Sequence, residues 1–194
     1  DHPMGDDYAA RLLKFVDELG LDRFTLVGHS LGAMMASAFA ANYPERISRL
    51  VLVCPAQGYG DEDDEVKQEI FQRRPKLLAK LGNLGMADER GPFLLGNPSA
   101  ENMEIVRTVS AGLMMQGFTA ASHLLAYDTI DQSLVKIEGE IDLYYGEEDG
   151  ITPAKGMFEL QRKFNNITLY GAANAGHLAY IDAPTYFKDT LFKS

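Results

Sequence analysis

Tryptophan is absent from this chain of 194 residues, and cysteine occurs once, at Cys54. A lone cysteine excludes an intrachain disulfide and fits a reducing compartment, so we expect a cytoplasmic protein. Cys54 stands in an apolar run, which predicts a small core residue rather than a reactive thiol. Long apolar runs are also missing, and none approaches the ~20 residues of a membrane-spanning helix. We therefore expect no membrane partner.

Basic residues are scarce as well. The chain has 18 Lys and Arg against 28 Asp and Glu, which gives a formal net charge of −10. The long-range field of such a chain repels phosphate, so nucleic acid and anionic membrane surfaces are excluded as partners. A hydrophobic fraction of 46% is ordinary for a globular protein. The length predicts one domain, with room for an insertion.

Strand and helix patterns alternate along most of the chain. Apolar runs at 24–27, 50–54, 141–145 and 167–170 predict strands. Amphipathic or small-residue stretches at 8–19 and 31–41 predict helices, and further helices are expected to start near Pro153 and Pro184. This alternation predicts an α/β fold with a doubly wound, mostly parallel sheet.

The middle of the chain differs in character. Helical patterns cover about 64–82, 99–115 and 118–127, interrupted by glycine and proline, and no strand pattern occurs. We therefore predict a core made of residues 1–56 and 138–194, with residues 57–137 as a helical insertion between two strands.

The motif with the clearest chemistry is Gly28-His29-Ser30-Leu31-Gly32, which joins the first predicted strand to the helix after it. A serine on such a sharp strand-to-helix turn is lifted above the sheet edge, so Ser30 is the predicted nucleophile. We expect both glycines to be required because a Cβ at either would collide with the neighbouring strand or helix. The helix N-terminus offers free N–H groups to a developing oxyanion.

A serine hydroxyl needs a base, and the base needs a group that orients it. His177 is the predicted base, since it follows the last strand in a Gly/Ala/Asn-rich loop at the edge where α/β sheets form sites. Asp149, in the loop after the strand at 141–145, is the predicted acid. Its rivals, Asp142, Glu147 and Glu148, lie within that strand or nearer its end.

Three motifs together carry a family resemblance: Gly28 to Gly32, Gly146-x-x-Asp149-x-x-Thr152-Pro153, and Ala175-Gly176-His177 followed by Pro184. The chain resembles the α/β-hydrolase superfamily, and looks most like its small-substrate branch of enol-lactone hydrolases, meta-cleavage-product hydrolases and cofactor-free esterases. The resemblance implies Ser30 as nucleophile, Asp149 as orienting acid and His177 as base. It also implies that the Leu31 N–H stabilises the oxyanion and that residues 57–137 form a helical cap.

The resemblance further implies strands that precede the first helix seen here. The start of the chain, 1–5, resembles the family's D-x-P-G-x-G loop, which normally comes well into the chain. We expect roughly 60–90 preceding residues, or a second subunit, to complete the sheet and supply a second oxyanion donor. We accordingly expect residues 1–194 alone to be poorly soluble or weakly active.

The predicted function is a serine hydrolase that cleaves a small, partly apolar ester or lactone through an acyl-enzyme. The alternatives are a C–C bond hydrolase with the same triad, against which the lack of tryptophan counts mildly, a ligand sensor with slow or no turnover, and an inactive scaffold. His29, Met114, Met115 and Phe118 are candidates for the substrate pocket, although methionines and Phe118 could simply pack the insertion. No cluster of histidine and carboxylate has ligand spacing, so we expect no metal or cofactor.

Overall fold

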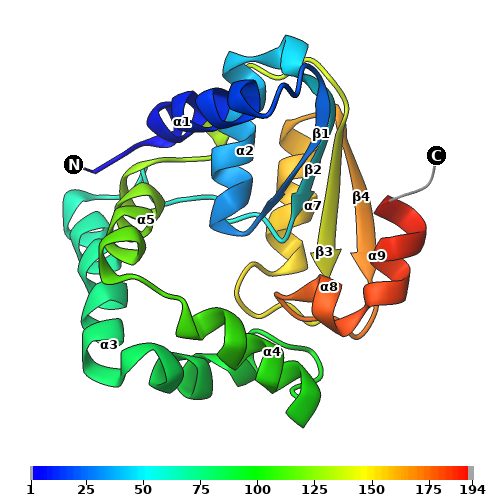
Figure 1. Cartoon of the computed structure of the whole chain (residues 1–194). Helices are drawn as coiled ribbons and strands as arrows, with labels where there is room; N and C mark the ends of the chain where they lie inside the picture. Colours follow the sequence, from blue (N-terminus) through cyan, green and yellow to red (C-terminus); the bar gives the residue numbers. More distant parts are fainter. Residues whose placement is uncertain (1, 192–194) are drawn as a thin grey trace.

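The computed structural model describes residues 2–191 and contains one sheet of four parallel strands (Figure 1). The strands are adjacent in chain order: β1 (Phe24–His29), β2 (Ile47–Val53), β3 (Ile141–Gly146) and β4 (Ile167–Ala172). All four predicted strands are confirmed. Parallel pairing brings the carboxyl ends of the strands to one edge of the sheet, and the loops that leave this edge carry Ser30, Asp149 and His177.

Helices cover both faces of the sheet, as the prediction of a doubly wound fold requires. Alternate residues of a strand point to opposite faces, so Leu50 and Leu52 of β2 face one layer while Val51 and Val53 face the other. The first layer is formed by α2 (Leu31–Asn42) and α7 (Ala154–Lys163), and the second by α8 (Ala179–Asp182) and α9 (Pro184–Leu191). Helix α1 (Gly5–Glu18) packs on α2. The short α8 was not predicted from the sequence.

Strand β2 is the most deeply buried element. Its last four residues, 50–53, are each at most 2% exposed. Burial on both faces explains why this strand has an unbroken apolar run instead of alternating polarity. Cys54 follows it and is fully buried, which confirms its prediction as a core residue. Strand β1 forms one edge of the described sheet, and Val27 on it is 46% exposed.

The chain between β2 and β3 is helical. It contains α3 (Asp64–Arg90), α4 (Ala100–Ala111), α5 (Met115–Tyr127) and α6 (Asp131–Leu134), with a 3-10 turn at Gly91–Phe93; another 3-10 turn, Pro44–Arg46, precedes β2. Helix α3 continues past the expected end at Gly82, where φ is +67° and the helix is interrupted. No strand occurs between β2 and β3 in the described chain, and the domain boundaries at 57 and 137 stay predictions. Figure 1 shows α3 and α4 away from the sheet, on the side of the strands' carboxyl ends.

No helix in the range 2–191 has both the length and the apolar character that crossing a lipid bilayer requires.

Candidate active site

Ser30 occupies the turn between β1 and α2 in a conformation that is unusual for a residue with a side chain. Its φ is +53° and its ψ is −118°. Backbone hydrogen bonds hold it there: the Ser30 N–H donates to Val53 O at 2.9 Å, and the Ser30 carbonyl accepts from Ala33 N at 3.0 Å and Ala56 N at 3.1 Å. Strained backbone persists only where surrounding contacts determine it. The strand-to-helix context expected for this serine is therefore present.

The two glycines of the motif differ. A Cβ at Gly28 would lie 2.5 Å from the Gly32 carbonyl oxygen and 2.7 Å from the Ala36 Cβ, so glycine is required at this crossing of β1 and α2. A Cβ at Gly32 would meet no described heavy atom within 4 Å. The expectation that both positions exclude a side chain is confirmed for Gly28 and wrong for Gly32, because a Cβ at Gly32 would enter open space among the described residues.

His177 links Ser30 to Asp149. Its Nε2 lies 2.9 Å from Ser30 Oγ, and its Nδ1 lies 2.9 Å from Asp149 Oδ2. An ionised carboxylate can only accept, so Nδ1 carries the proton and Nε2 accepts the hydrogen bond from the serine hydroxyl. His177 is 4% exposed, and Asp149 is 5% exposed. The three residues predicted from separate motifs thus form one hydrogen-bonded chain.

Asp149 is held ionised by its surroundings. Burial alone would raise the pKa of Asp149, but the hydrogen bond and charge of His177 and the hydrogen bonds from Thr152 outweigh it and lower this pKa to about 2. Oδ1 accepts from the backbone N–H groups of Ile151 at 2.7 Å and Thr152 at 2.9 Å. The rival carboxylates Glu147 and Glu148 are exposed and make no hydrogen bond to His177.

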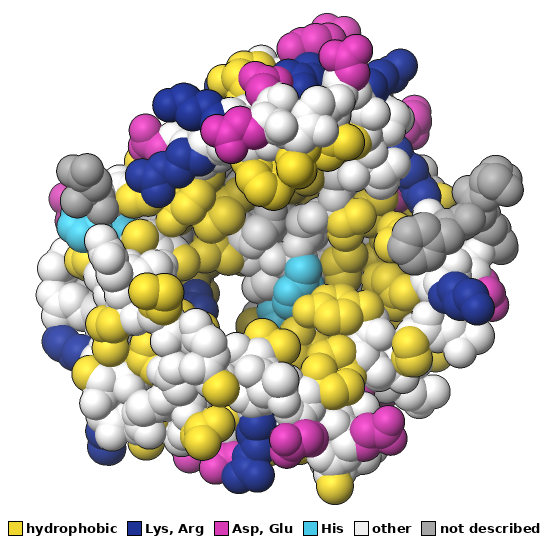
Figure 2. All heavy atoms as spheres, in the orientation of Figure 1, with side chains coloured by type: hydrophobic (Ala, Val, Ile, Leu, Met, Phe, Trp, Pro, Cys, Tyr) yellow, Lys and Arg dark blue, Asp and Glu magenta, His cyan; other side chains and the backbone are white. Residues whose placement is uncertain are grey.

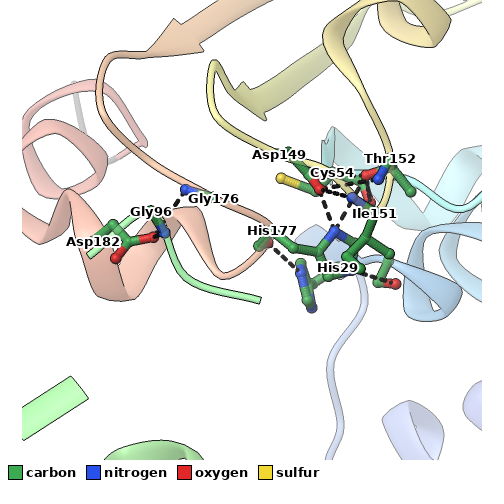
Figure 3. Close-up of polar contacts among 10 residues, drawn as sticks. His29, Cys54, Gly96, Asp149, Ile151, Thr152, Gly176, His177 and Asp182 are labelled. Carbon is green, nitrogen blue, oxygen red and sulfur yellow. Dashed lines mark hydrogen bonds and ion pairs between the residues drawn. The ribbon is translucent and has the colours of Figure 1, made fainter. Parts of the chain in front are cut away.

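Thr152 also belongs to the site, although the sequence motif that contains it did not predict this role. Its hydroxyl lies 2.7 Å from Asp149 Oδ2, 3.2 Å from His177 Nδ1 and 3.2 Å from the Cys54 carbonyl oxygen (Figure 3). A threonine three residues after an aspartate is typical of a turn in which the aspartate accepts backbone hydrogen bonds, and this spacing could have revealed it.

His29, predicted as a pocket residue, does not line the cavity beside Ser30. Successive side chains of a strand point in opposite directions, and the His29 side chain instead reaches the main chain of His177, with Nε2 2.9 Å from its carbonyl oxygen (Figure 3). Burial, and then the charge of His177, lowers the pKa of His29 to about 4. A neutral His29 that donates through Nε2 therefore fixes the backbone of His177.

The loop that carries His177 is also fixed to the helical segment. Asp182 of α8 accepts hydrogen bonds from Gly176 N at 2.9 Å and Gly96 N at 2.8 Å (Figure 3). It also accepts one from Asn97 N at 3.1 Å. A Cβ at Gly176 would lie 2.5 Å from Gly96 N, so glycine permits this close approach of two backbones. No sequence pattern indicated this contact, because Gly96 and Asp182 are 86 residues apart in the chain.

A cavity of about 880 Å³ opens beside Ser30 and His177. Figure 2 shows a hollow in the middle of the displayed face, with histidine at one side of it. The backbone N–H of Leu31 is the first in α2, where no intrahelical acceptor exists, and no other described group accepts a hydrogen bond from it. Leu31 lines the cavity together with Ser30, so this N–H is available next to the serine hydroxyl.

Of the other predicted pocket residues, Phe118 lines the cavity and the two methionines do not. Met114 is 73% exposed and Met115 is 43% exposed, because they lie where α4 turns into α5 and point outward. Helical periodicity did not reveal this turn. The apolar lining comes instead mainly from α3, α4 and neighbouring residues, and includes Leu77, Met86, Leu94, Val106 and Leu113.

Cys54, Asp149 and His177 offer ligand atoms within 4.8 Å of one another, the spacing of a metal site. Metal ligation by cysteine requires the thiolate. Burial, and then the charge of Asp149, raises the pKa of Cys54 to about 12, so the thiol stays protonated. Asp149 and His177 are already hydrogen-bonded to each other. This group therefore fits a metal poorly.

Comparison with known proteins assigns the family. The model of the alpha/beta hydrolase fold family matches residues 2–184, and the chain belongs to this family. The "Putative carbamate hydrolase RutD" of Caulobacter sp. (strain K31) is 28% identical over 193 residues, which cover 95% of this chain and 68% of that protein. The human monoacylglycerol lipase ABHD6 is 23% identical, over 92% of this chain and 57% of the lipase.

Among solved structures, a thermophilic esterase from Thermogutta terrifontis superposes with a TM-score of 0.84 at 22% identity, over 98% of this chain and 71% of the esterase. This likeness supports the fold. The chain thus belongs to a family of hydrolases and spans between 57% and 71% of the length of these three relatives.

Proposed function

We propose that the protein is a serine hydrolase that cleaves a small, partly apolar carboxylic ester or lactone through an acyl-enzyme. The observation that carries this proposal is the hydrogen-bonded chain from Ser30 through His177 to Asp149, with both links at 2.9 Å, at the wall of the 880 Å³ cavity.

The geometry suggests how each group acts. Ser30 Oγ attacks the substrate carbonyl carbon while His177 Nε2 takes the hydroxyl proton, and Asp149 stabilises the imidazolium that forms. The Leu31 N–H donates to the oxyanion of the tetrahedral intermediate. His177 then gives its proton to the leaving alkoxide, and water attacks the acyl-enzyme by the reverse sequence of proton transfers to release the acid.

The cavity supports a small substrate with apolar parts. Its volume lies within the ~300–1,000 Å³ usual for small-ligand sites. The curated relatives named as a putative carbamate hydrolase and a monoacylglycerol lipase are consistent with a hydrolase of small molecules.

The test is turnover of p-nitrophenyl butyrate by the wild type, by Ser30→Ala and by the control Ser37→Ala. We expect Ser30→Ala to lower kcat/KM by at least ~10³-fold, the scale on which triad serines act. Ser37 is buried in α2 and its hydroxyl has no described partner, so Ser37→Ala should keep activity. Equal turnover by Ser30→Ala and the wild type would contradict the proposal.

A further inference from the structure

The charged side chains that line the cavity are all positive. Its charged side chains are Arg73, Arg74 and Arg90, all from α3, and no aspartate or glutamate among the described residues lines it. In a chain with 28 acidic and 18 basic residues, a cavity that collects three arginines without an acid is opposite in charge to the molecule as a whole.

These arginines have no anionic partner in the described part of the chain. Their guanidinium groups make no ion pair and no hydrogen bond within residues 2–191, whereas other arginines, such as Arg46, Arg49 and Arg107, each pair with an aspartate. Arg74 lies over the ring of Phe118, 4.9 Å from its centroid, and Arg90 lies over Phe93 at 5.7 Å. An aromatic face orients a guanidinium and leaves its N–H donors unused.

The three groups also act on one another. Burial, and then the positive charges of Arg73 and Arg90, lower the pKa of Arg74. Arg73 and Arg90 are exposed and Arg74 is partly buried, so the repulsion falls mainly on Arg74, and a bound anion would relieve it. Guanidinium forks match carboxylate and phosphate oxygens, so such an anion would satisfy the unused donors.

The arginines lie across the cavity from the serine. Ser30 and His177 come from the loops at the carboxyl ends of the strands, whereas α3 belongs to the helical segment (Figure 1). Figure 2 shows a basic side chain on the opposite side of the hollow from the histidine. Apolar side chains such as Leu77 and Leu113 line the same cavity.

We propose that this cavity selects esters whose apolar chain ends in an anionic group, a carboxylate or a phosphate, which Arg73, Arg74 and Arg90 bind while the ester carbonyl lies at Ser30. This inference rests on the proposed hydrolase function, since it names the substrate class of the same site. The anion positions the substrate and takes no part in bond breaking.

Binding is measured in the Ser30→Ala background, so that no probe is consumed, by calorimetry at low salt. The neutral probe is the diester dimethyl adipate. The anionic probes are monomethyl adipate, which carries a carboxylate, and pentyl phosphate, which carries a phosphate. We expect at least one anion to bind about 10- to 100-fold more tightly than the neutral diester, the scale of hydrogen bonds to charged groups. The more tightly bound anion identifies the preferred group.

The preference for anionic over neutral probes should depend on the arginines and not on the net charge of the protein. Arg74→Gln should reduce the ratio of the two affinities by about tenfold, and the triple variant that combines Arg73→Gln, Arg74→Gln and Arg90→Gln should abolish the preference. Lys80→Gln removes one positive charge from an exposed position of α3 outside the cavity and should leave the preference unchanged. If the triple variant does not fold, the salt dependence decides: raising NaCl to about 300 mM should weaken binding of the anions and not of the neutral diester.

Equal affinity for neutral and anionic probes, or a preference that Arg74→Gln and salt leave intact, would overturn the inference, as would no binding of any probe. The hydrolase proposal fails separately. If the anions bind preferentially but the wild type hydrolyses neither p-nitrophenyl butyrate nor the mono-p-nitrophenyl ester of adipic acid, the anion site stands and the reaction assigned to it does not.

Discussion

On the strand side, His177 lines the cavity, and Asp149, which does not line it, accepts hydrogen bonds from His177 Nδ1, Ile151 N, Thr152 N and Thr152 Oγ1. On the helical side, the guanidinium groups of Arg73, Arg74 and Arg90 make no hydrogen bond or ion pair with any described residue. The charged group behind the strand side of the cavity therefore has partners within the protein, whereas the charged groups that line the helical side have none among the described residues.

This difference corresponds to two tasks, proton transfer and substrate binding. A group that takes part in proton transfer must be held in one geometry and one protonation state, and its partners are built into the protein. A group that binds substrate must keep its donors unused until the ligand arrives, at a cost in folding stability. We infer that the strand side supplies the chemistry and the helical side supplies the selection, and three changes test this division.

The largest effect is expected from Asp149→Asn. The amide cannot hold the His177 tautomer that keeps Nε2 free to accept the Ser30 proton, so kcat/KM should fall by about 10³- to 10⁴-fold. Glu148→Gln is the matched control, because Glu148 is exposed in the same loop, and it should change kcat/KM by no more than about twofold. Steady-state ester hydrolysis measures both, and similar losses in the two variants would show that the acid is misassigned.

An intermediate effect concerns pH and His29. The folded protein holds the pKa of His29 at about 4, below its ordinary value of 6.5, so the unfolded chain binds this proton first as the pH falls. The contribution of neutral His29 to stability is complete above about pH 6.5 and is lost towards pH 4, by about 2–3 kcal/mol. Urea unfolding between about pH 4.5 and 8 measures this loss.

Gln in place of His29 can donate the same hydrogen bond to the His177 carbonyl but does not titrate. His29→Gln should therefore flatten the stability curve between about pH 4.5 and 6.5 while leaving it similar at about pH 8. Parallel curves for the variant and the wild type would show that His29 is not the group responsible.

The smallest effect compares the two sides directly. Thr152→Val removes a hydroxyl that contacts Asp149 and His177, and should lower the free energy of unfolding by about 1–2 kcal/mol. Arg74→Met removes a charge that has no described anionic partner. The lost contact with the Phe118 ring and the relieved repulsion from Arg73 and Arg90 oppose each other, so this free energy should change by less than about 0.5 kcal/mol. Thr152→Ser should restore most of the loss. A larger loss in Arg74→Met than in Thr152→Val would contradict the division between the two sides.

The sequence predicted the strand side well because its signals are local. The apolar runs at 24–27 and 50–54 are typical of buried strands. The Gly-x-Ser-x-Gly motif at the end of the first run predicted that Ser30 lies on the turn between a strand and a helix. Asp149 and His177 were found because loops that follow parallel strands meet at one edge. The roles of Thr152 and His29 were missed because they depend on the direction of single side chains.

The helical side was predicted poorly because its signals are not local. Arg73 and Arg74 resemble ordinary charged residues of a helix, and their meeting with Arg90 depends on the interruption of α3 at Gly82 and on how that helix packs. Met114 and Met115 suggested an adaptable pocket, but the turn between α4 and α5 exposes them. Periodicity predicts helices without placing them against one another.

Ser30 is the residue that we expect to become acylated. The most direct measurement is labelling with a fluorophosphonate probe, followed by digestion and peptide mass spectrometry, with Ser30→Ala treated in parallel. We predict that the label is found on Ser30 and that the variant takes up none. A label on Ser37 or Ser122, or equal labelling of the variant, would contradict the account.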